Sequence, residues 1–284
     1  MRQIILQLAE DGSLRKDLHV HTKFCDGSGT PDEIVRAAID KGLDVIGFSG
    51  HAHTPFDEEV CMSVDGMEEY EKAVRAAADK YAGEIRVLCG TEQDYYSDQP
   101  TDRWDYVIGS VHYIEVPADT SAADEKTDAP AADDPCARAG NFAYPSVDDT
   151  TEIFEDAVER YFDGDVYAFA EAYYDVLSDV VRKTGADIIG HFDLISKFNA
   201  GGENGGKGKY FDESHPRYVA AWQKAADALL ETGALFEINY GGMNRGRRNE
   251  PYPSKPIRDY LEARGGRFIR SSDSHVPETL ACWE

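Results

Sequence analysis

Apolar positions along the chain follow two patterns that alternate with each other. Continuous apolar runs such as Leu43–Ser49, Tyr106–Val111 and Leu235–Asn239 have the length of buried strands. Between such runs, apolar residues recur at helical spacing, which predicts helices at 151–162 and 216–232. The repeating unit is therefore strand, loop and helix, which is typical of a parallel α/β fold.

Start and stop signals sharpen these boundaries. Thr30 is predicted to cap a helix, with Pro31 at its first position, Glu33 completing a capping box and Gly42 ending it. Further helices are predicted at 67–82 and 166–183 and around Ile257–Arg264. The first predicted strand ends at Asp17–His21. The other six predicted strands are Leu43–Ser49, Ile85–Thr91, Tyr106–Val111, Asp187–Gly190, Leu235–Asn239 and Arg267–Ser272.

The strand count predicts the fold class. Seven strands in β/α alternation indicate a distorted (β/α)7 barrel that resembles a TIM barrel but is one unit short of the usual eight. The 284 residues fit one such domain, over 1–284. An open doubly wound sheet is the alternative, and it is weakened because no glycine-rich dinucleotide fingerprint follows the first strand.

Two segments interrupt the alternation. Residues 117–144 are rich in Ala, Asp and Pro, with hardly any large apolar residues before Phe142, and we predict a disordered acidic surface insertion there. Gly201–Lys209 is rich in glycine and predicts a flexible loop that acts as a lid.

Charge and cysteine content narrow the classes of partner. Lys and Arg number 29 and Asp and Glu 54, so the net charge is 29 − 54 = −25, which disfavours nucleic acid and anionic membranes. An anionic small substrate would need local cations that reverse this sign. The five cysteines are odd in number and lack C-x-x-C spacing, so we expect no disulfide framework, no thiolate zinc site and a reducing cytoplasm. No apolar stretch approaches the roughly 20 residues of a membrane helix, and Met1–Glu10 does not resemble a signal peptide.

Histidines and carboxylates gather where predicted strands end. In a parallel barrel the loops at the carboxyl ends of the strands form the active site, so these side chains are expected to converge. The candidate metal ligands are His19, His21, Asp26, His51, Glu92, His112, His191, Asp273 and His275.

The residue types indicate a transition-metal centre. Alternate strand residues point the same way, so the H-x-H at His19 and His21 directs both imidazoles at one ion, and the D-x-H at Asp273 and His275 directs mixed ligands. Imidazole with carboxylate suits Zn, Mn or Fe rather than Ca or Mg. Each motif alone also fits structural histidines, but the conjunction favours two or three ions, with Glu92 able to bridge a pair.

The motif order resembles that of the polymerase and histidinol phosphatase (PHP) family over nearly the whole chain. The strings are D-L-H-V-H-T at Asp17–Thr22, F-S-G-H at Phe48–His51, G-T-E at Gly90–Glu92, G-S-V-H at Gly109–His112, G-H-F-D at Gly190–Asp193 and S-D-S-H at Ser272–His275. The resemblance implies a (β/α)7 barrel with a trinuclear site. It assigns one ion to His19, His21, Glu92 and Asp273, a second to Glu92, His112 and His191, and a third to Asp26, His51 and His275.

Other stretches resemble the histidinol phosphatases of that family. They include His191–Asn199 and Asn244–Ser254. This resemblance implies hydrolysis of L-histidinol phosphate, a step of histidine biosynthesis. It also implies a final helix beyond Asp273–His275, which we expect to be missing because the chain ends at Glu284.

The expected chemistry is in-line attack on phosphorus by a metal-activated water. Arg245, Arg248 and Lys197 are the candidate phosphate-binding residues, and Glu92, Asp273 and His53 are the candidate catalytic residues. Two alternatives remain at this point: a PHP phosphoesterase acting on another monoester or on nucleic-acid ends, and a non-catalytic metal-binding barrel. The oligomeric state has no signal in the sequence.

Overall fold

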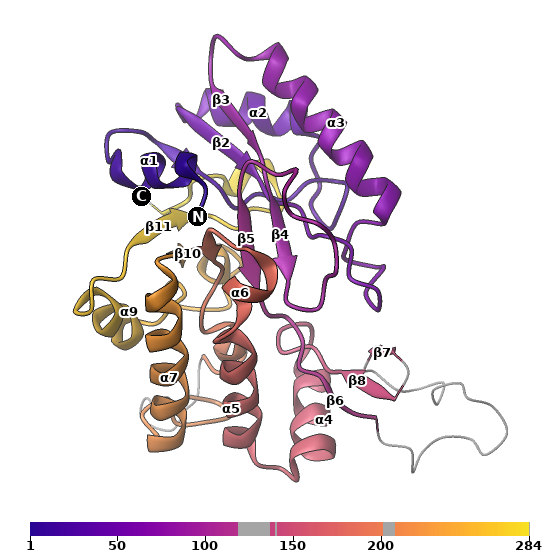
Figure 1. The fold of residues 1–284 in the computed structure, drawn as a ribbon, viewed down its shortest axis with the longest axis vertical. Coiled ribbons are helices and arrows are strands. Elements are labelled where there is room, and N and C mark those ends of the chain that lie inside the picture. Colours follow the sequence, from indigo (N-terminus) through magenta and orange to yellow (C-terminus); the bar gives the residue numbers. More distant parts are fainter. Residues whose placement is uncertain (119–136, 140, 201–207, 284) are drawn as a thin grey trace, which may run out of the picture.

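Parallel strands run through the centre of the molecule and helices surround them (Figure 1). The computed structural model describes residues 1–118, 137–139, 141–200 and 208–283. The strands are β1 (Lys16–Asp17), β2 (Val45–Phe48), β3 (Arg86–Cys89), β4 (Thr91–Asp94), β5 (Val107–Ser110), β6 (Val116–Pro117), β7 (Ala137–Ala139), β8 (Phe142–Tyr144), β9 (Ile188–Ile189), β10 (Leu235–Asn239) and β11 (Phe268–Ser271). The α-helices are α1 (Gln3–Glu10), α2 (Pro31–Asp40), α3 (Val64–Lys80), α4 (Thr151–Phe162), α5 (Val166–Leu177), α6 (Val180–Thr184), α7 (Pro216–Thr232), α8 (Gly241–Asn244) and α9 (Lys255–Glu262), and the 3₁₀ helices are η2 (Leu194–Ser196) and η3 (Pro277–Thr279).

The predicted parallel α/β architecture is confirmed, and its distortion is visible in the strand pairing. One parallel sheet has the order β1–β2–β3, and the other has the order β11–β10–β9–β5–β4. Single parallel bridges connect the two sheets: Val20, after β1, pairs with Ser274, after β11, and His51, after β2, pairs with Glu92 on β4. The strands therefore follow one another in chain order, as in a barrel, without one continuous hydrogen-bonded ladder in the described residues.

The chain passes from the first sheet to the second at Gly90, between β3 and β4. The ring of Tyr106 packs against this point, and a Cβ on Gly90 would lie 2.4 Å from its Cε1. The Tyr106 hydroxyl donates hydrogen bonds to the carbonyl oxygens of Leu18 and Phe48, at 2.6 and 2.9 Å. One buried side chain thus connects the segments of β1, β2 and β5 beside the point where the two sheets separate, and its close approach to Gly90 requires glycine.

Several helix boundaries follow their capping residues. Helix α2 begins with the predicted capping box of Thr30 and Glu33. Helix α3 begins three residues before the predicted Met67, because the Ser63 side chain caps it by accepting from the Gly66 N–H. The predicted single helix at 166–183 is wrong, since α5 ends at Leu177 and α6 starts at Val180.

Helix α1 has no counterpart in the sequence prediction. Its buried residues Ile5 and Leu8 pack against Leu18, Leu235 and other residues of the strands. The main chain and guanidinium of Arg2 bind Asp187, which directly precedes β9. Helix α1 therefore covers the amino-terminal ends of the strands and leaves their carboxyl ends free for a site.

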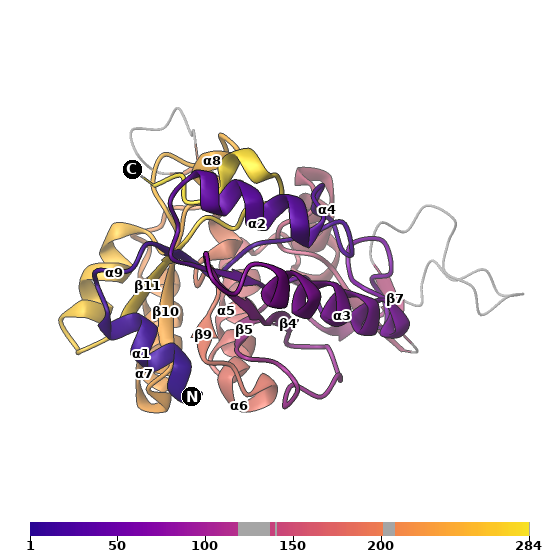
Figure 2. The same cartoon turned by 90° about the horizontal axis from the view of Figure 1, so that it is seen from above.

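The helices fall into two groups on the outside. Figure 1 shows α2 and α3 at one end of the molecule and α4, α5 and α7 at the other, and Figure 2, seen from the first end, shows α2 and α3 in front of the other group. Helix α5 packs against both α4 and α7. The large apolar side chains of α5 and α7, such as Phe169, Tyr174 and Trp222, are buried in the largest hydrophobic cluster of the described residues.

The ends of the predicted insertion are ordered into a small sheet. Strands β6 and β7 both pair antiparallel with β8, which differs from the irregular structure expected for the whole of 117–144. Residues 119–136 and 140 lie outside the described residues, as do 201–207 of the predicted lid.

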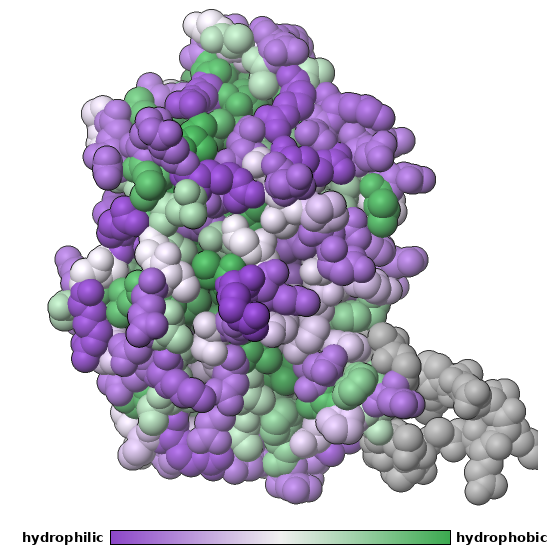
Figure 3. Space-filling view, viewed as in Figure 1, coloured by the Kyte–Doolittle hydropathy of each residue, from purple (hydrophilic) through white to green (hydrophobic). Residues whose placement is uncertain are grey.

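Polar side chains cover most of the face drawn in Figure 3. Figure 3 shows a predominantly hydrophilic face with hydrophobic residues in small groups, as the net charge of −25 leads one to expect. In the described part of the chain, no helix has the length and apolar character needed to cross a membrane.

Candidate metal centre

The carboxyl ends of the strands surround a pocket with a volume of about 630 Å³. Seven of the nine predicted metal ligands line it: Asp26, His51, Glu92, His112, His191, Asp273 and His275. The other two, His19 and His21, are buried and contact Glu92. The structure thus brings together all nine side chains, although 256 positions (275 − 19) separate the first from the last.

Glu92, on β4, lies at the centre of this group and is only 1% exposed. Its Oε2 atom faces three imidazoles: the distances are 3.1 Å to His19 Nε2, 3.2 Å to His51 Nδ1 and 3.5 Å to His21 Nε2. These three rings come from the loops after β1 and β2. One carboxylate oxygen is therefore directed at one side of the pocket.

The second oxygen of Glu92 faces a different group. Its Oε1 atom lies 2.9 Å from His191 Nε2 and 3.5 Å from His112 Nε2. The Ser110 hydroxyl donates to the same oxygen at 2.6 Å and fixes the carboxylate plane. Two oxygens that each face their own set of imidazoles have the arrangement of a carboxylate that bridges two ions.

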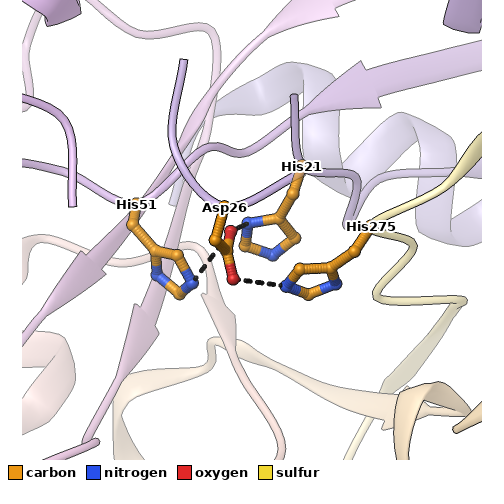
Figure 4. A group of neighbouring side chains, drawn as sticks. All are labelled: His21, Asp26, His51 and His275. Carbon is orange, nitrogen blue, oxygen red and sulfur yellow. Dashed lines mark ion pairs between the residues drawn. The ribbon is translucent and has the colours of Figure 1, made fainter. Parts of the chain in front are cut away.

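Asp26 lies between the imidazoles of His21, His51 and His275 (Figure 4). Its Oδ2 lies 2.8 Å from His275 Nε2, and its Oδ1 lies 3.3 Å from His21 Nδ1 and 3.8 Å from His51 Nε2. The rings of His21 and His275 stack, with centroids 4.1 Å apart. These four residues offer ligand atoms close enough to hold one ion. His21 joins the predicted trio of Asp26, His51 and His275 here.

Asp273 faces the H-x-H pair. Its Oδ1 lies 3.4 Å from His21 Nε2 and 3.8 Å from His19 Nε2, so these three residues form another possible ion site. Asp273 has a φ of 50°, in the left-handed region that Asp tolerates better than most residues. Gly241 leaves room for it, because a Cβ there would lie 2.5 Å from Asp273 Oδ2.

The charges of this group fit a bound cation. Burial alone would raise the pKa of Glu92, but the neighbouring His19 and His51 outweigh it and hold that pKa well below its usual value. Burial, opposed by the charges of Glu92 and Asp26, lowers the pKa of His51 to about 4. His21 Nε2 is buried and has no hydrogen-bond partner among the described residues. Imidazole lone pairs directed at carboxylates repel unless a proton or metal ion lies between them, so the donor set suits a divalent transition metal.

Two carboxylates that the sequence analysis missed hold ligand histidines from outside. Glu237 lies 2.6 Å from His19 Nδ1, and Asp94 lies 3.2 Å from His112 Nδ1. Such outer carboxylates orient imidazoles at metal sites. The signal for Glu237 was an acidic residue inside the apolar run Leu235–Asn239, and for Asp94 its position two residues after Glu92, on the same side of the strand.

Of the three candidate phosphate-binding cations, two line the pocket. Arg245 is 38% exposed and donates to Asp273 Oδ2 at 2.9 Å, beside His275. Lys197 lies 3.0 Å from Asp148, another pocket residue. Arg248 is elsewhere: it is buried, contacts Ser196 and Asp193 and stacks on Tyr252.

His53 does not line the pocket as far as the structure describes the chain. Its ring Nδ1 lies 3.3 Å from the Met62 carbonyl, and its own carbonyl accepts from Ser97. Its position two residues after His51 is the only sequence feature that predicts a place for it near the site.

A further part of the pocket wall is acidic and aromatic. Phe56 and Tyr144 stack with centroids 4.0 Å apart, and Tyr113 meets Phe56 edge-on at 5.0 Å. Five further carboxylates line the same pocket beyond the proposed ligands: Asp57, Glu58, Glu59, Asp148 and Asp149. This wall, called the acidic rim below, has the opposite character to a nucleic-acid groove.

Comparison with known proteins agrees with the motif order. The model of the PHP domain matches residues 17–241. A probable histidinol-phosphatase of Deinococcus radiodurans is 27% identical over 272 residues, which cover 92% of this chain and 86% of the relative.

Solved structures share the fold. HisK of Listeria monocytogenes superposes with a TM-score of 0.71 at 19% identity and covers 95% of this chain and 98% of its own. Histidinol phosphate phosphatase (HisK) of Lactococcus lactis, complexed with Zn, L-histidinol and phosphate, has a TM-score of 0.61 at 19% identity and covers 93% and 87%. Since the family model spans most of the sequence, the chain belongs to the PHP domain family.

Proposed function

We propose that this protein is a metal-dependent phosphomonoesterase that hydrolyses L-histidinol phosphate to L-histidinol and phosphate. The proposal rests mainly on the arrangement of Glu92 in the pocket: its two carboxylate oxygens each face a separate set of imidazoles. The curated relative in Deinococcus radiodurans is a probable histidinol-phosphatase, and the Lactococcus lactis structure holds Zn, L-histidinol and phosphate.

Two to three divalent ions (Zn, Mn or Fe) are the proposed cofactors. His19, His21, Glu92 and Asp273 would hold the first, Glu92, His112 and His191 the second, and Asp26, His51 and His275 the third. Bound divalent ions supply a reactive water at neutral pH and neutralise the charge of a phosphate dianion. Without them, an acidic protein with this rim would repel its anionic substrate.

The side chains of the pocket have distinct parts in the reaction. Water adds to phosphorus while the ester oxygen–phosphorus bond breaks, and the leaving alkoxide takes up a proton. The guanidinium of Arg245, beside Asp273 and His275, is positioned to donate to a phosphate oxygen. Lys197, held by Asp148, adds a second positive charge to the same pocket.

The acidic rim supports the assignment of this alcohol. L-histidinol carries a primary ammonium group and an imidazole ring, so it is both cationic and aromatic. The carboxylates of Asp57, Glu58 and Asp149 complement the cation, and the Phe56 and Tyr144 rings offer a stacking surface. Oligonucleotide ends and anionic monoesters would meet repulsion at the same wall.

Phosphate release from a panel of monoesters tests the proposal. Purified protein would be stripped with a chelator, reloaded with Zn, Mn or Fe, and assayed with L-histidinol phosphate, glycerol phosphate, serine phosphate and a 5′-phosphorylated oligonucleotide. We expect kcat/KM to be highest for L-histidinol phosphate and activity to be lost on chelation. A higher kcat/KM for the oligonucleotide or for another monoester of the panel would contradict the substrate assignment. Metal binding without any turnover would indicate a non-catalytic barrel.

A further inference from the structure

Glu237, on β10, is a fully buried carboxylate that forms hydrogen bonds with four groups in the described part of the chain. Its Oε1 lies 2.6 Å from His19 Nδ1 and also accepts from the Ser271 hydroxyl. Its Oε2 accepts from the His191 backbone N–H at 2.8 Å and from Asn239 Nδ2 at 2.9 Å. An ionised carboxylate accepts and never donates, so both oxygens are fully used by these partners.

This arrangement decides which nitrogen of His19 carries a proton. A hydrogen bond to the acceptor Glu237 requires the proton on Nδ1, because two lone pairs would otherwise face each other. The other nitrogen, Nε2, is then the one directed at the pocket. It lies 3.1 Å from Glu92 Oε2 and 3.8 Å from Asp273 Oδ1, the two carboxylates proposed to share an ion with it.

The same carboxylate also fixes the ligands of a second ion. By accepting from the His191 N–H, it holds the start of the loop that carries this imidazole to Glu92 Oε1. Through Asn239, whose Nδ2 lies 3.3 Å from Asp273 Oδ2, it reaches a ligand that follows β11. One buried side chain thus joins ligand-bearing segments after β1, β9 and β11.

We propose that Glu237 is a positioning residue of the metal centre. It orients His19 so that Nε2 faces the metal, and it fixes the positions of His191 and Asp273 relative to that ring. The inference rests on the proposed metal-dependent function. Glu237 itself contacts neither metal nor substrate in this scheme, and its effect on both passes through the histidines.

A glutamine cannot replace it. Glutamine has the same shape, but one of its two terminal atoms is an NH₂ group, which only donates. In one orientation this group faces His19 Nδ1 and Ser271, and in the other it faces the His191 N–H and Asn239. In the second orientation a donor is buried against two donors. In the first, the same happens unless His19 changes to the tautomer with the proton on Nε2, and that atom is then no longer offered to a metal.

Zinc titration of Glu237→Gln tests this against a matched variant. Asp187→Asn makes the same acid-to-amide change in a fully buried residue, but Asp187 accepts from Arg2 and Val107 at the opposite ends of the strands. In competition with a chelator, we expect Glu237→Gln to raise the Kd for Zn²⁺ by about 10- to 100-fold, as is usual when outer partners of metal ligands are lost. Asp187→Asn should bind zinc like the wild type, although its melting temperature falls.

The tautomer of His19 gives a measurement that needs no variant to fold. Long-range ¹H–¹⁵N NMR of the zinc-loaded wild type should show His19 protonated at Nδ1 and metal-bound at Nε2. Zinc on Nδ1, or unchanged zinc affinity in Glu237→Gln, overturns the positioning role alone. A wild type that retains no zinc, manganese or iron overturns the metal centre itself, and the two failures are therefore distinguishable.

Discussion

At the residue scale, Glu92 and Glu237 are residues of the same type with two different roles. His19 lies between them, with Nε2 toward Glu92 and Nδ1 toward Glu237. Glu92 borders the pocket and faces ring nitrogens, whereas Glu237 lies behind the ring and is enclosed by donors. Their neighbours, rather than the residue type, decide that one is a proposed ligand and the other a support.

Loss of a ligand of the proposed second ion should strongly lower catalysis without unfolding the protein. We expect Glu92→Ala and His191→Ala each to lower kcat by at least about 100-fold, since a metal ion contributes several kcal/mol to stabilising the transition state. Far-ultraviolet circular dichroism should stay unchanged, because the strand ends keep their backbone pairing. Glu84→Ala and His215→Ala, at sites outside the pocket, are the controls and should keep wild-type turnover. Wild-type-like turnover in either ligand variant would rule out the bridging arrangement.

Arg245 and Arg248 should respond in opposite ways to the same truncation. Arg245→Ala removes a half-exposed pocket cation, and we expect kcat/KM to fall by about 10- to 100-fold, the value of a charged hydrogen bond to phosphate. Arg248→Ala leaves the fully buried Asp193 without its cation, which should destabilise the fold by about 3–5 kcal/mol. Steady-state kinetics and urea denaturation of both variants separate the two effects. Loss of activity in Arg248→Ala without loss of stability would show that Arg248 binds the substrate instead of supporting the fold.

At the element scale, short strands and firmly capped helices hold the ligand loops. The loop that carries Asp26 is closed by hydrogen bonds from Lys23 N to Gly29 O and from Ser28 N to His275 O, both 2.9 Å. Helix α2 begins immediately after it, with the Thr30 hydroxyl accepting from the Glu33 N–H. The loop is therefore fixed at both its ends, independently of the capping side chain.

Removal of this cap should cost stability but not activity. Thr30→Ala leaves N–H groups of the first turn of α2 without an acceptor, and we expect the free energy of unfolding to fall by about 1 kcal/mol. Zinc affinity and turnover should stay unchanged because the backbone bonds of the Asp26 loop remain. Thr151→Ala, at a helix start where Thr150 is the cap, is the matched control in urea denaturation and should have little effect. A large loss of turnover in Thr30→Ala would mean that the cap positions Asp26.

At the scale of the whole molecule, the net charge of −25 sets two opposing demands. Mutual repulsion of the carboxylates destabilises the compact state, while the proposed centre needs acidic ligands to hold its ions. Surface ion pairs, such as Arg217 with both Asp165 and Glu171, offset part of this repulsion. Bound divalent ions would offset a further part at the pocket.

Salt should therefore stabilise the protein. We expect the melting temperature to rise steadily as KCl is increased from low to molar concentration, because the screening length falls from about 30 Å at 0.01 M to 3 Å at 1 M. Differential scanning fluorimetry measures this, with sucrose at equal osmolality as the control for general exclusion effects. A melting temperature that falls with KCl would show that attractive ion pairs dominate the surface.

Much of the architecture could be read from local patterns. The capping box at Thr30 and the helix over Thr151–Phe162 depend only on neighbouring residues, and both are present. The cover formed by α1 was not predicted, because it depends on packing against distant strands. The break between Leu177 and Val180 was not predicted either, and the α6 that follows it packs against β5. For the same reason, Arg248 seemed equivalent to Arg245 in sequence, yet it binds the buried Asp193.

The sequence by itself determined the alternation of strands and helices and the positions of histidines and carboxylates at strand ends, since periodicity and capping are local properties. Only the tertiary structure decided which oxygen of Glu92 faces which imidazole, that Glu237 supports His19 from behind, and that His53 turns toward Met62. Those relations join residues far apart in the chain. They are set by how strands and loops pack together, which no local spacing encodes.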